Sequence, residues 1–272
     1  MDTSPHIALI APPWAVMWVL AIAIYSILKG LVFCIADRQD IPVWRQAAFL
    51  FAWPGMDSNS FMVETCGLDQ RPTAIEFLFA VAKLFIGLAM LLGAVPKAVT
   101  FNDNLLGWIG MIGIALSLHF GLFHLLSCIW RSCGICATAI MNWPICAVSL
   151  SDFWGRRWNL AFRDLTYQFI YRPLSRRIGT RLSLMVGFLA SGLVHDFVIS
   201  VPAQDGYGGP TCYFVLQGLG IGFEKSSFGR AIGLGRGVRG RLFCAATVLL
   251  PSGYLFHPAF ISRVIIPFLT CR

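Results

Sequence analysis

The stretch best equipped for chemistry is residues 151–164, which carries aspartates, arginines, tryptophans and an asparagine in an otherwise apolar chain. Read as one helix, it places four polar residues at i, i+4, i+7 and i+11 on one face: Asp152, Arg156, Asn159 and Arg163. Asp152 precedes Arg156 by four residues, the orientation that favours an ion pair within a helix. Tryptophans beside arginines are also typical of an interfacial anchor helix at a membrane surface.

A histidine lies further along the chain, inside the apolar run 182–202. Four residues recur every fourth position in this run: Ser183, Gly187, Ser191 and His195. A row of small residues lets helices approach closely, so we expect His195 to face a helix bundle and not lipid. Its position alone leaves open whether it is functional or simply hydrogen-bonded across helices.

Together these two segments resemble the membrane-bound O-acyltransferases, and within them the wax-synthase-like branch. Six stretches carry the resemblance, the last of them more weakly: residues 151–159, 171–174, 191–196, 255–258, 263–268 and 54–57. The resemblance covers roughly the second half of the chain, from Asn142 onward. It implies that His195 is catalytic and that Asn159 is the second active-site residue.

The chemistry suits these residue types. A neutral imidazole, with a reference pKa of about 6.5, can take the proton of an attacking hydroxyl. The Asn159 side-chain amide can donate a hydrogen bond to the oxyanion of the tetrahedral intermediate. The resemblance implies transfer from acyl-CoA to a long-chain fatty alcohol, giving a wax ester, with no other cofactor and no metal. O-acetylation of a hydroxylated secondary metabolite is the alternative within the same class.

Acyl-CoA carries phosphates and adenine, so we expect basic and aromatic side chains of 151–164 to bind it. The candidate substrate-binding residues are Trp154, Arg156, Arg157, Trp158, Arg163 and Asp152. Each arginine, taken singly, is equally well explained by membrane topology and contact with lipid headgroups.

The composition requires a membrane setting. The chain has 272 residues, of which 57% are apolar and only 12% charged, against about 25% charged in soluble domains. We therefore expect an all-α, polytopic transmembrane helix bundle in a single domain, residues 1–272, of a bacterial inner membrane or the endoplasmic reticulum. The apolar runs predict about seven or eight spanning helices plus interfacial helices, enclosing a catalytic tunnel. The sequence leaves the oligomeric state open.

The expected spans differ in clarity. The clear spans are residues 13–35, 73–95, 104–130 and 182–202, and the shorter ones are 134–150, 211–223, 242–256 and 257–271. Residues 46–54 are too short to cross comfortably, and Trp53-Pro54-Gly55 breaks them, which predicts a re-entrant or interfacial piece.

The net charge of +8 is concentrated in two segments. Residues 156–181 and 224–241 hold 12 of the 21 basic residues, whereas 203–210 holds none. The positive-inside rule places both basic segments in the cytoplasm and 203–210 on the other side. This pattern favours contact with phospholipid over nucleic acid.

A rival interpretation from another class is a transporter whose proton path uses Glu76, Lys83 and His119. Glu76 and Lys83 are seven residues apart, about 10 Å along a helix, so they cannot pair directly. No inverted repeat is visible, which disfavours a transporter. His119 and His124 differ by about 140° around a helix and do not form an i, i+4 metal pair.

The cysteines include the pattern Cys133-Gly134-Ile135-Cys136. No second pair lies at zinc spacing, and no thioredoxin-like strand precedes the pattern. We interpret this C-x-x-C as coincidental.

Overall fold

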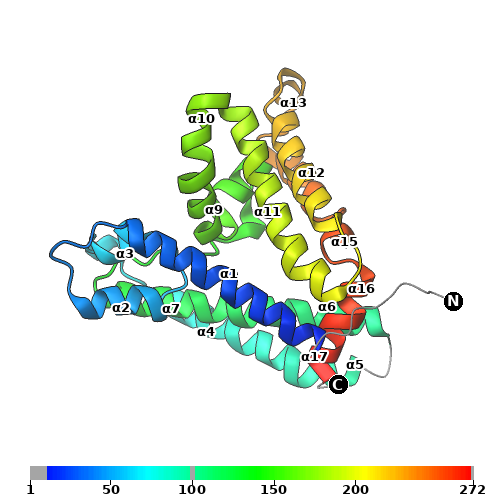
Figure 1. The fold of residues 1–272 in the computed structure, drawn as a ribbon, viewed down its shortest axis with the longest axis horizontal. Helices are drawn as coiled ribbons and strands as arrows, with labels where there is room; N and C mark the ends of the chain where they lie inside the picture. Colours follow the sequence, from blue (N-terminus) through cyan, green and yellow to red (C-terminus); the bar gives the residue numbers. More distant parts are fainter. Residues whose placement is uncertain (1–10, 99–101, 271–272) are drawn as a thin grey trace.

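The computed structural model describes residues 11–98 and 102–270, and these are helical over most of their length (Figure 1). The described residues form no sheet, and an isolated β-bridge joins Thr65 to Ile135. The expected all-α fold is confirmed.

The first half of the chain supplies three long helical runs and two short helices. Its α-helices are α1 (Pro13–Ile35), α2 (Val43–Phe51), α3 (Ser58–Met62), α4 (Ala74–Ala89), α5 (Val95–Ala98), α6 (Asp103–Ile114) and α7 (Phe123–Ser132). A π-helical stretch, Met90–Ala94, joins α4 to α5, and another, Ala115–Leu122, joins α6 to α7.

The second half is more broken. Its α-helices are α8 (Leu150–Asp152), α9 (Leu160–Thr166), α10 (Arg172–Ile178), α11 (Thr180–Ala203), α12 (Gly209–Glu224), α13 (Ser227–Ala231), α14 (Gly237–Leu249), α15 (Ser252–Leu255), α16 (Pro258–Phe260) and α17 (Ile266–Thr270). Three π-helical turns interrupt it: Phe153–Arg157, Tyr167–Tyr171 and Ile261–Ile265.

Helix starts follow the local sequence. Pro13 occupies the first turn of α1, where a missing N–H costs nothing. The Thr73 hydroxyl accepts the Glu76 N–H at 3.2 Å and caps α4. The Asn102 side chain caps α6 by accepting the Asn104 N–H at 2.7 Å.

By length and composition, the described residues contain four helical segments able to cross a membrane, or up to five if a bent pair counts as one span. The four are Pro13–Ile35, Leu68–Ala94, Asp103–Ser132 and Thr180–Ala203. They match the four spans that the sequence marks most clearly. An integral membrane protein follows from them, but the expected count of seven or eight is too high.

The predicted number of spanning helices was too high because it included the shorter apolar runs. Residues 134–150 are mostly irregular, with one short 3-10 turn, Pro144–Cys146. Helix α12 has 16 residues, which at 1.5 Å per residue is about 24 Å, short of a bilayer core of about 30 Å. Gly237–Leu255 and Pro258–Thr270 form the bent pair, at 62° to each other. An apolar run therefore does not by itself predict a crossing.

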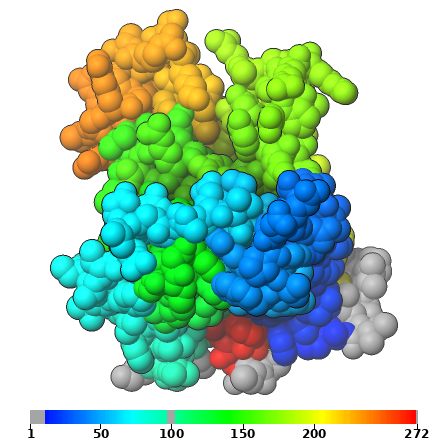
Figure 2. Space-filling model, turned by 90° about the vertical axis from the view of Figure 1, so that its left-hand side faces the viewer, coloured from blue at the N-terminus to red at the C-terminus, as the bar shows by residue number. Residues whose placement is uncertain are grey.

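The two basic segments include helices at the same end of the molecule. Helices α10 and α13 stand at the same end of the molecule, and Figure 2 shows their surroundings as two separate projections, coloured yellow-green and orange. The connection between α11 and α12 lies at the opposite end, beside α16 (Figure 1). This arrangement agrees with basic segments on one side of a membrane and residues 203–210 on the other.

Helices α11 and α12 form an antiparallel hairpin with close backbone contact. A Cβ on Gly192 would lie 2.7 Å from the Thr211 Cα, too close for any larger residue. On the other side of α11, a Cβ on Gly187 would lie 2.8 Å from Thr166 Cγ2. The small residues of α11 thus let α9 and α12 approach it, as small-residue rows do.

Candidate active site

The stretch 151–164 is not one helix. Trp158 is extended, with φ −99° and ψ 125°, and Asn159 is left-handed, with φ 42° and ψ 62°. Asparagine tolerates this conformation better than most residues. Its Oδ1 accepts the Phe162 N–H at 3.2 Å and starts α9 there. The predicted common helical face is therefore wrong.

Asp152 pairs with Arg157 and not with Arg156. Arg157 Nε lies 2.6 Å from Asp152 Oδ2, which also accepts the Val148 N–H at 3.2 Å. The cause is the π-helical turn between them, in which the Trp158 N–H reaches back five residues to the Phe153 carbonyl at 2.9 Å. Such a turn aligns residues five apart, where an α-helix aligns residues four apart.

Both tryptophans of the motif pack in the interior. Trp154 Nε1 donates to Gln217 Oε1 at 3.2 Å, and its ring lies edge-on to Phe188 at 5.7 Å. Trp158 stacks on Phe153 with ring centroids 5.5 Å apart. These contacts explain the positions of the indoles without a ligand, and their stacking on adenine stays a prediction.

The arginines are engaged to different degrees. Arg163 donates from Nε to Asp164 Oδ1 at 2.8 Å and from Nη1 to the Gly155 carbonyl at 2.9 Å. Arg157 is held by Asp152. Arg156 is exposed, and within the described ranges its guanidinium has no protein partner. Of the three, Arg156 is therefore the one whose charge is open to a ligand, although phosphate binding stays a prediction.

His195 faces the interior of the bundle, as the row of small residues predicts. Its ring centroid lies 4.4 Å from that of Phe214 in α12 and 6.2 Å from that of Phe162 in α9. Nδ1 lies 2.7 Å from the carbonyl oxygen of Ser191, one turn earlier in α11. The imidazole is thus clamped by one hydrogen bond and two rings.

Phe162 contacts both Asn159 and His195. Asn159 caps α9, and Phe162, whose N–H binds that cap, is also the residue whose ring touches His195. The link between the two predicted catalytic residues is thus indirect, and their roles stay predictions.

Asp196 organises the start of α12. Its Oδ1 accepts from Ser200 Oγ at 2.8 Å and from the Gly208 N–H at 2.9 Å. Its Oδ2 accepts the Thr211 N–H at 3.1 Å and also the Thr211 hydroxyl. The sequence signals Asp196 as an acid inside an apolar run and as the end of the stretch 191–196, and it gives no partner.

Two further polar residues were missed by sequence reasoning, and both are on α12. Glu224 is 4% exposed, and its carboxylate accepts the Leu150 N–H at 2.6 Å and the Ser151 N–H at 3.3 Å. It therefore caps α8, at the start of the motif. Gln217 is fully buried and links Trp154 to the Thr247 carbonyl, to which its Nε2 donates at 2.9 Å.

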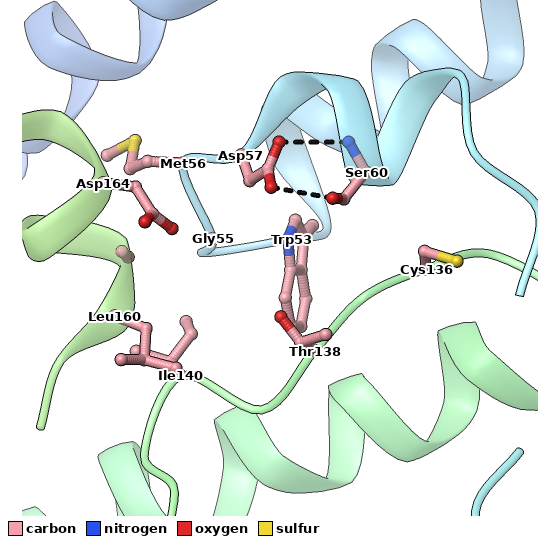
Figure 3. A pocket seen from close by; sticks show the side chains of 11 residues that line it. Trp53, Gly55, Met56, Asp57, Ser60, Cys136, Thr138, Ile140, Leu160 and Asp164 are labelled. Carbon is pink, nitrogen blue, oxygen red and sulfur yellow. Dashed lines mark hydrogen bonds between the residues drawn. The ribbon is translucent and has the colours of Figure 1, made fainter. Parts of the chain in front are cut away.

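A cleft lies on another side of α9, between that helix and the turn at Trp53–Asp57 (Figure 3). Its lining comes from the turn, the irregular segment and α9: Trp53, Gly55, Met56, Asp57, Ser60, Cys136, Thr138, Ile140, Leu160, Ala161 and Asp164. Burial raises the pKa of the Asp164 carboxyl, and the neighbouring Arg163 guanidinium opposes that rise. Asp57 caps α3 by accepting the Ser60 N–H at 3.0 Å.

The turn at Trp53–Asp57 forms one wall of this cleft, and side chains from two helices bind the backbone there. Lys29 of α1, only 2% exposed, donates to the Gly55 carbonyl and lies 3.3 Å from the centroid of the Phe49 ring. Trp130 Nε1 of α7 donates to the Ala52 carbonyl at 3.0 Å. Sequence analysis missed Lys29, whose only signal is a single charge inside an apolar span.

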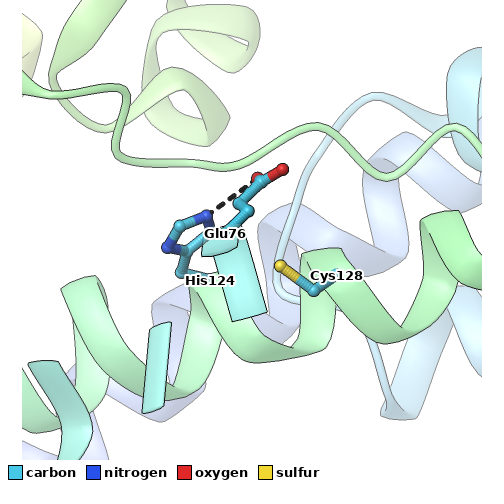
Figure 4. Close-up of side chains that lie close together, drawn as sticks. All are labelled: Glu76, His124 and Cys128. Atoms are coloured by element: carbon cyan, nitrogen blue, oxygen red, sulfur yellow. Dashed lines mark hydrogen bonds and ion pairs between the residues drawn. The ribbon is translucent and has the colours of Figure 1, made fainter. Parts of the chain in front are cut away.

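A polar cluster links α4 to α7 (Figure 4). His124 Nε2 lies 3.0 Å from Glu76 Oε1, and its Nδ1 lies 2.8 Å from Lys83 Nζ. Glu76 and Lys83 do not pair directly, as predicted, because His124 bridges them. His119, the histidine named in the transporter interpretation, instead lies edge-on to Phe123 at 5.4 Å.

Three donor atoms of this cluster, from Glu76, His124 and Cys128, lie within 4.8 Å of one another. The Arg131 guanidinium binds the Glu76 carboxylate, and its Nη2 also lies 3.7 Å from Cys128 Sγ. A metal ion there would have to displace this guanidinium. The cluster as it stands balances Glu76 with a protein cation.

Comparison with known proteins finds similarity over part of the chain. Residues 137–216 match the family described as "Membrane bound O-acyl transferase family". A long-chain-alcohol O-fatty-acyltransferase of Simmondsia chinensis is 36% identical over 135 residues, which is 45% of this chain and 38% of that protein. A probable long-chain-alcohol O-fatty-acyltransferase 3 of Arabidopsis thaliana is 32% identical over 138 residues, 46% of this chain and 40% of that protein.

The matches are partial. The chain spans about two fifths of the length of these relatives, and no solved structure matches it significantly. The matched region nevertheless includes α9, α11 and the part of α12 that contacts His195. Over this region, the chain is similar to the membrane bound O-acyl transferase family.

Proposed function

We propose that this chain is an integral membrane O-acyltransferase that moves an acyl group from acyl-CoA to a hydroxyl acceptor. The observation that carries the proposal is the 2.7 Å contact between His195 Nδ1 and the Ser191 carbonyl oxygen. A carbonyl only accepts hydrogen bonds, so Nδ1 carries the proton of the neutral ring and Nε2 keeps its lone pair. Nε2 is then the general base that takes the proton of the attacking hydroxyl.

Asn159 supplies the complementary donor. Its Oδ1 is used in capping α9, so its amide N–H groups are the part left to bind a ligand. A donor aimed at the oxyanion stabilises the transition state more than the ground state. The hydroxyl oxygen attacks the thioester carbonyl, and the proton held by His195 passes to the departing CoA thiolate. No G-x-S-x-G nucleophile motif occurs in the sequence, which favours direct transfer within a ternary complex.

The acceptor we propose is a long-chain fatty alcohol, and the product a wax ester. This part rests on the names of the relatives, which act on long-chain alcohols. The apolar surroundings of His195, with Phe162 and Phe214 against it, suit an alkyl chain.

The donor is proposed to enter from the cytoplasm, across a bacterial inner membrane or that of the endoplasmic reticulum. The two basic segments lie at one end of the molecule, where anionic lipid and CoA phosphates are both attracted. His195 lies roughly 20 Å along α11 from that end, at 1.5 Å per residue. The thioester must therefore reach deep, and the exposed Arg156 is proposed to hold a phosphate.

The decisive experiment offers the purified protein, in detergent, a panel of acyl-CoAs and alcohols and identifies the esters by mass spectrometry. We expect ester formation with wild type and its loss in His195→Ala, with the variant still inserted and monodisperse. His119→Ala and His257→Ala are the matched controls and should be much milder. Near-normal turnover in His195→Ala would disprove the base assignment, and the absence of any ester with wild type would disprove the activity.

A further inference from the structure

Two cysteines that are far apart in the sequence lie at neighbouring ends of two spanning segments. Cys66 comes just before the span that begins at Leu68, and Cys136 comes just after the span that ends at Ser132. Both side chains are 8% exposed. The C-x-x-C pattern suggests Cys133 as the neighbour of Cys136, but Cys133 is exposed.

Backbone contacts hold the two segments side by side. An antiparallel bridge joins Thr65 to Ile135, and the Cys66 N–H donates to the Gly134 carbonyl at 2.9 Å. Opposite residues of an antiparallel pair point to one side, and residues two apart along a strand share that side. Cys66, opposite Gly134, therefore points to the same side as Cys136.

The two thiols therefore share one side of the paired segments. Cys136 Sγ donates to Gln70 Oε1 at 3.6 Å. Both cysteines are free thiols in this structure. A disulfide requires the two Cα atoms to lie within about 7 Å of each other, and the backbone pairing keeps the two segments adjacent.

We propose that Cys66 and Cys136 form an oxidative modification site, at which a small peroxide converts the two thiols to one reversible disulfide. One thiolate attacks hydrogen peroxide, the O–O bond breaks, and the products are a cysteine sulfenic acid and water. The second thiol then attacks the sulfenic sulfur, the S–S bond forms and a second water leaves. Two thiols give up two electrons and two protons, and the peroxide is reduced to two waters.

The electrostatic setting predicts how the rate depends on pH. Burial raises the pKa of the Cys136 thiol, the neighbouring Cys66 adds to the rise, and the Arg45 guanidinium opposes it. The charged and titratable groups facing this thiol are therefore Cys66, Glu64 and Arg45. Because the thiolate is the nucleophile, oxidation should accelerate as pH rises from about 7 to about 9.

The cross-link would act on the cleft beside α9. Cys136 lines that cleft together with Leu160 and Ala161. A disulfide to Cys66 would tie this wall to the segment that leads into α4. The site does not depend on the proposed acyl transfer, so it is tested without an activity assay.

The experiment treats the purified full chain in detergent with hydrogen peroxide, alkylates the remaining thiols, digests the protein and maps linked peptides by mass spectrometry. We expect a peptide joining Cys66 to Cys136, with the loss of two alkylatable thiols, and reversal by dithiothreitol. Cys66→Ser and Cys136→Ser should each abolish it. Cys133→Ser is the matched control and should leave it unchanged.

Three results would overturn the proposal. One is a Cys133–Cys136 link in wild type in place of the expected peptide. Another is persistence of the two free thiols, or their conversion to sulfinic acid without a link. The third is loss of the link in Cys133→Ser. The wild-type peptide map decides the question by itself if a serine variant fails to fold.

Discussion

The carboxylate of Asp196 in α11 accepts both the backbone N–H, at 3.1 Å, and the hydroxyl of Thr211 in α12. The residue next to the proposed base therefore fixes the start of the neighbouring helix. Three residues beyond Thr211, Phe214 rests against the His195 ring. A hydrogen-bond network around Asp196 thus sets the packing partner of His195.

Replacing this network should cost both stability and activity. Asp196→Ala leaves the Gly208 and Thr211 N–H groups without their charged acceptor, and hydrogen bonds to charged groups contribute about 1.5–3 kcal/mol each. We expect a clear drop in thermal midpoint in detergent and a lower kcat. Asp205→Ala, at an exposed carboxylate in the same connection, is the control. An unchanged midpoint in Asp196→Ala would show that the network is not formed in the protein.

Substitutions of Asn159 can separate its role in capping α9 from its proposed role as a hydrogen-bond donor to the oxyanion. Asn159→Gly keeps the left-handed backbone, and glycine at a cap costs only a few tenths of a kcal/mol. It removes the amide, so kcat should fall by roughly ten- to a thousandfold, the range for one oxyanion donor. Asn159→Asp keeps a capping oxygen but has no amide donor, and it should be equally impaired. An effect confined to the KM for acyl-CoA would make Asn159 a binding residue instead.

Asp164 should give stability a defined pH dependence. Burial raises its pKa in the folded protein, so the folded state holds the proton more tightly than the unfolded chain. The free energy of unfolding therefore falls as pH rises from the unfolded value, about 3.9, through the raised folded value. Asp164→Asn cannot titrate and should lack this fall.

The measurement is the thermal midpoint of wild type minus that of Asp164→Asn across an acidic to neutral pH series. This difference should decrease with rising pH. Asp37 is an exposed aspartate that is distant from Asp164 in the sequence. Asp37→Asn therefore serves as the control for nonspecific charge effects. A wild-type advantage that grows with pH would mean that the Arg163 pairing outweighs burial.

Sidedness can be tested with single cysteines in a background without the exposed native ones. Gly206 is a poor position, because a Cβ there would lie 2.4 Å from the His257 ring and its φ is +69°. The adjacent Tyr207 is 65% exposed and suits the purpose. Tyr207→Cys should react with an impermeant maleimide from outside intact cells, and Thr180→Cys should not. The reverse pattern would contradict both the topology and cytoplasmic entry of acyl-CoA.

The sequence by itself determined the features that depend on local pattern. Long apolar runs gave the four clear spans, because twenty or so apolar residues form a helix wherever lipid is the solvent. The row from Ser183 to His195 placed the histidine toward the bundle, because small side chains are needed where helices touch. The motif residues around Asn159 and His195 showed a resemblance to the membrane-bound O-acyltransferases before any geometry was known.

Other features depend on contacts between distant residues, and only the tertiary structure decided them. Periodicity could not show that the chain turns left-handed at Asn159, because Trp154 in the π-helical turn and Trp158 after it pack against residues distant in the sequence. Hydropathy could not tell a crossing from a short apolar helix, since both bury apolar surface. Spacing along one helix showed that Glu76 and Lys83 cannot meet, but the bridging His124 comes from another helix. The same holds for Cys66 and Cys136: their proximity is set by how two loops pair in space, which no local pattern records.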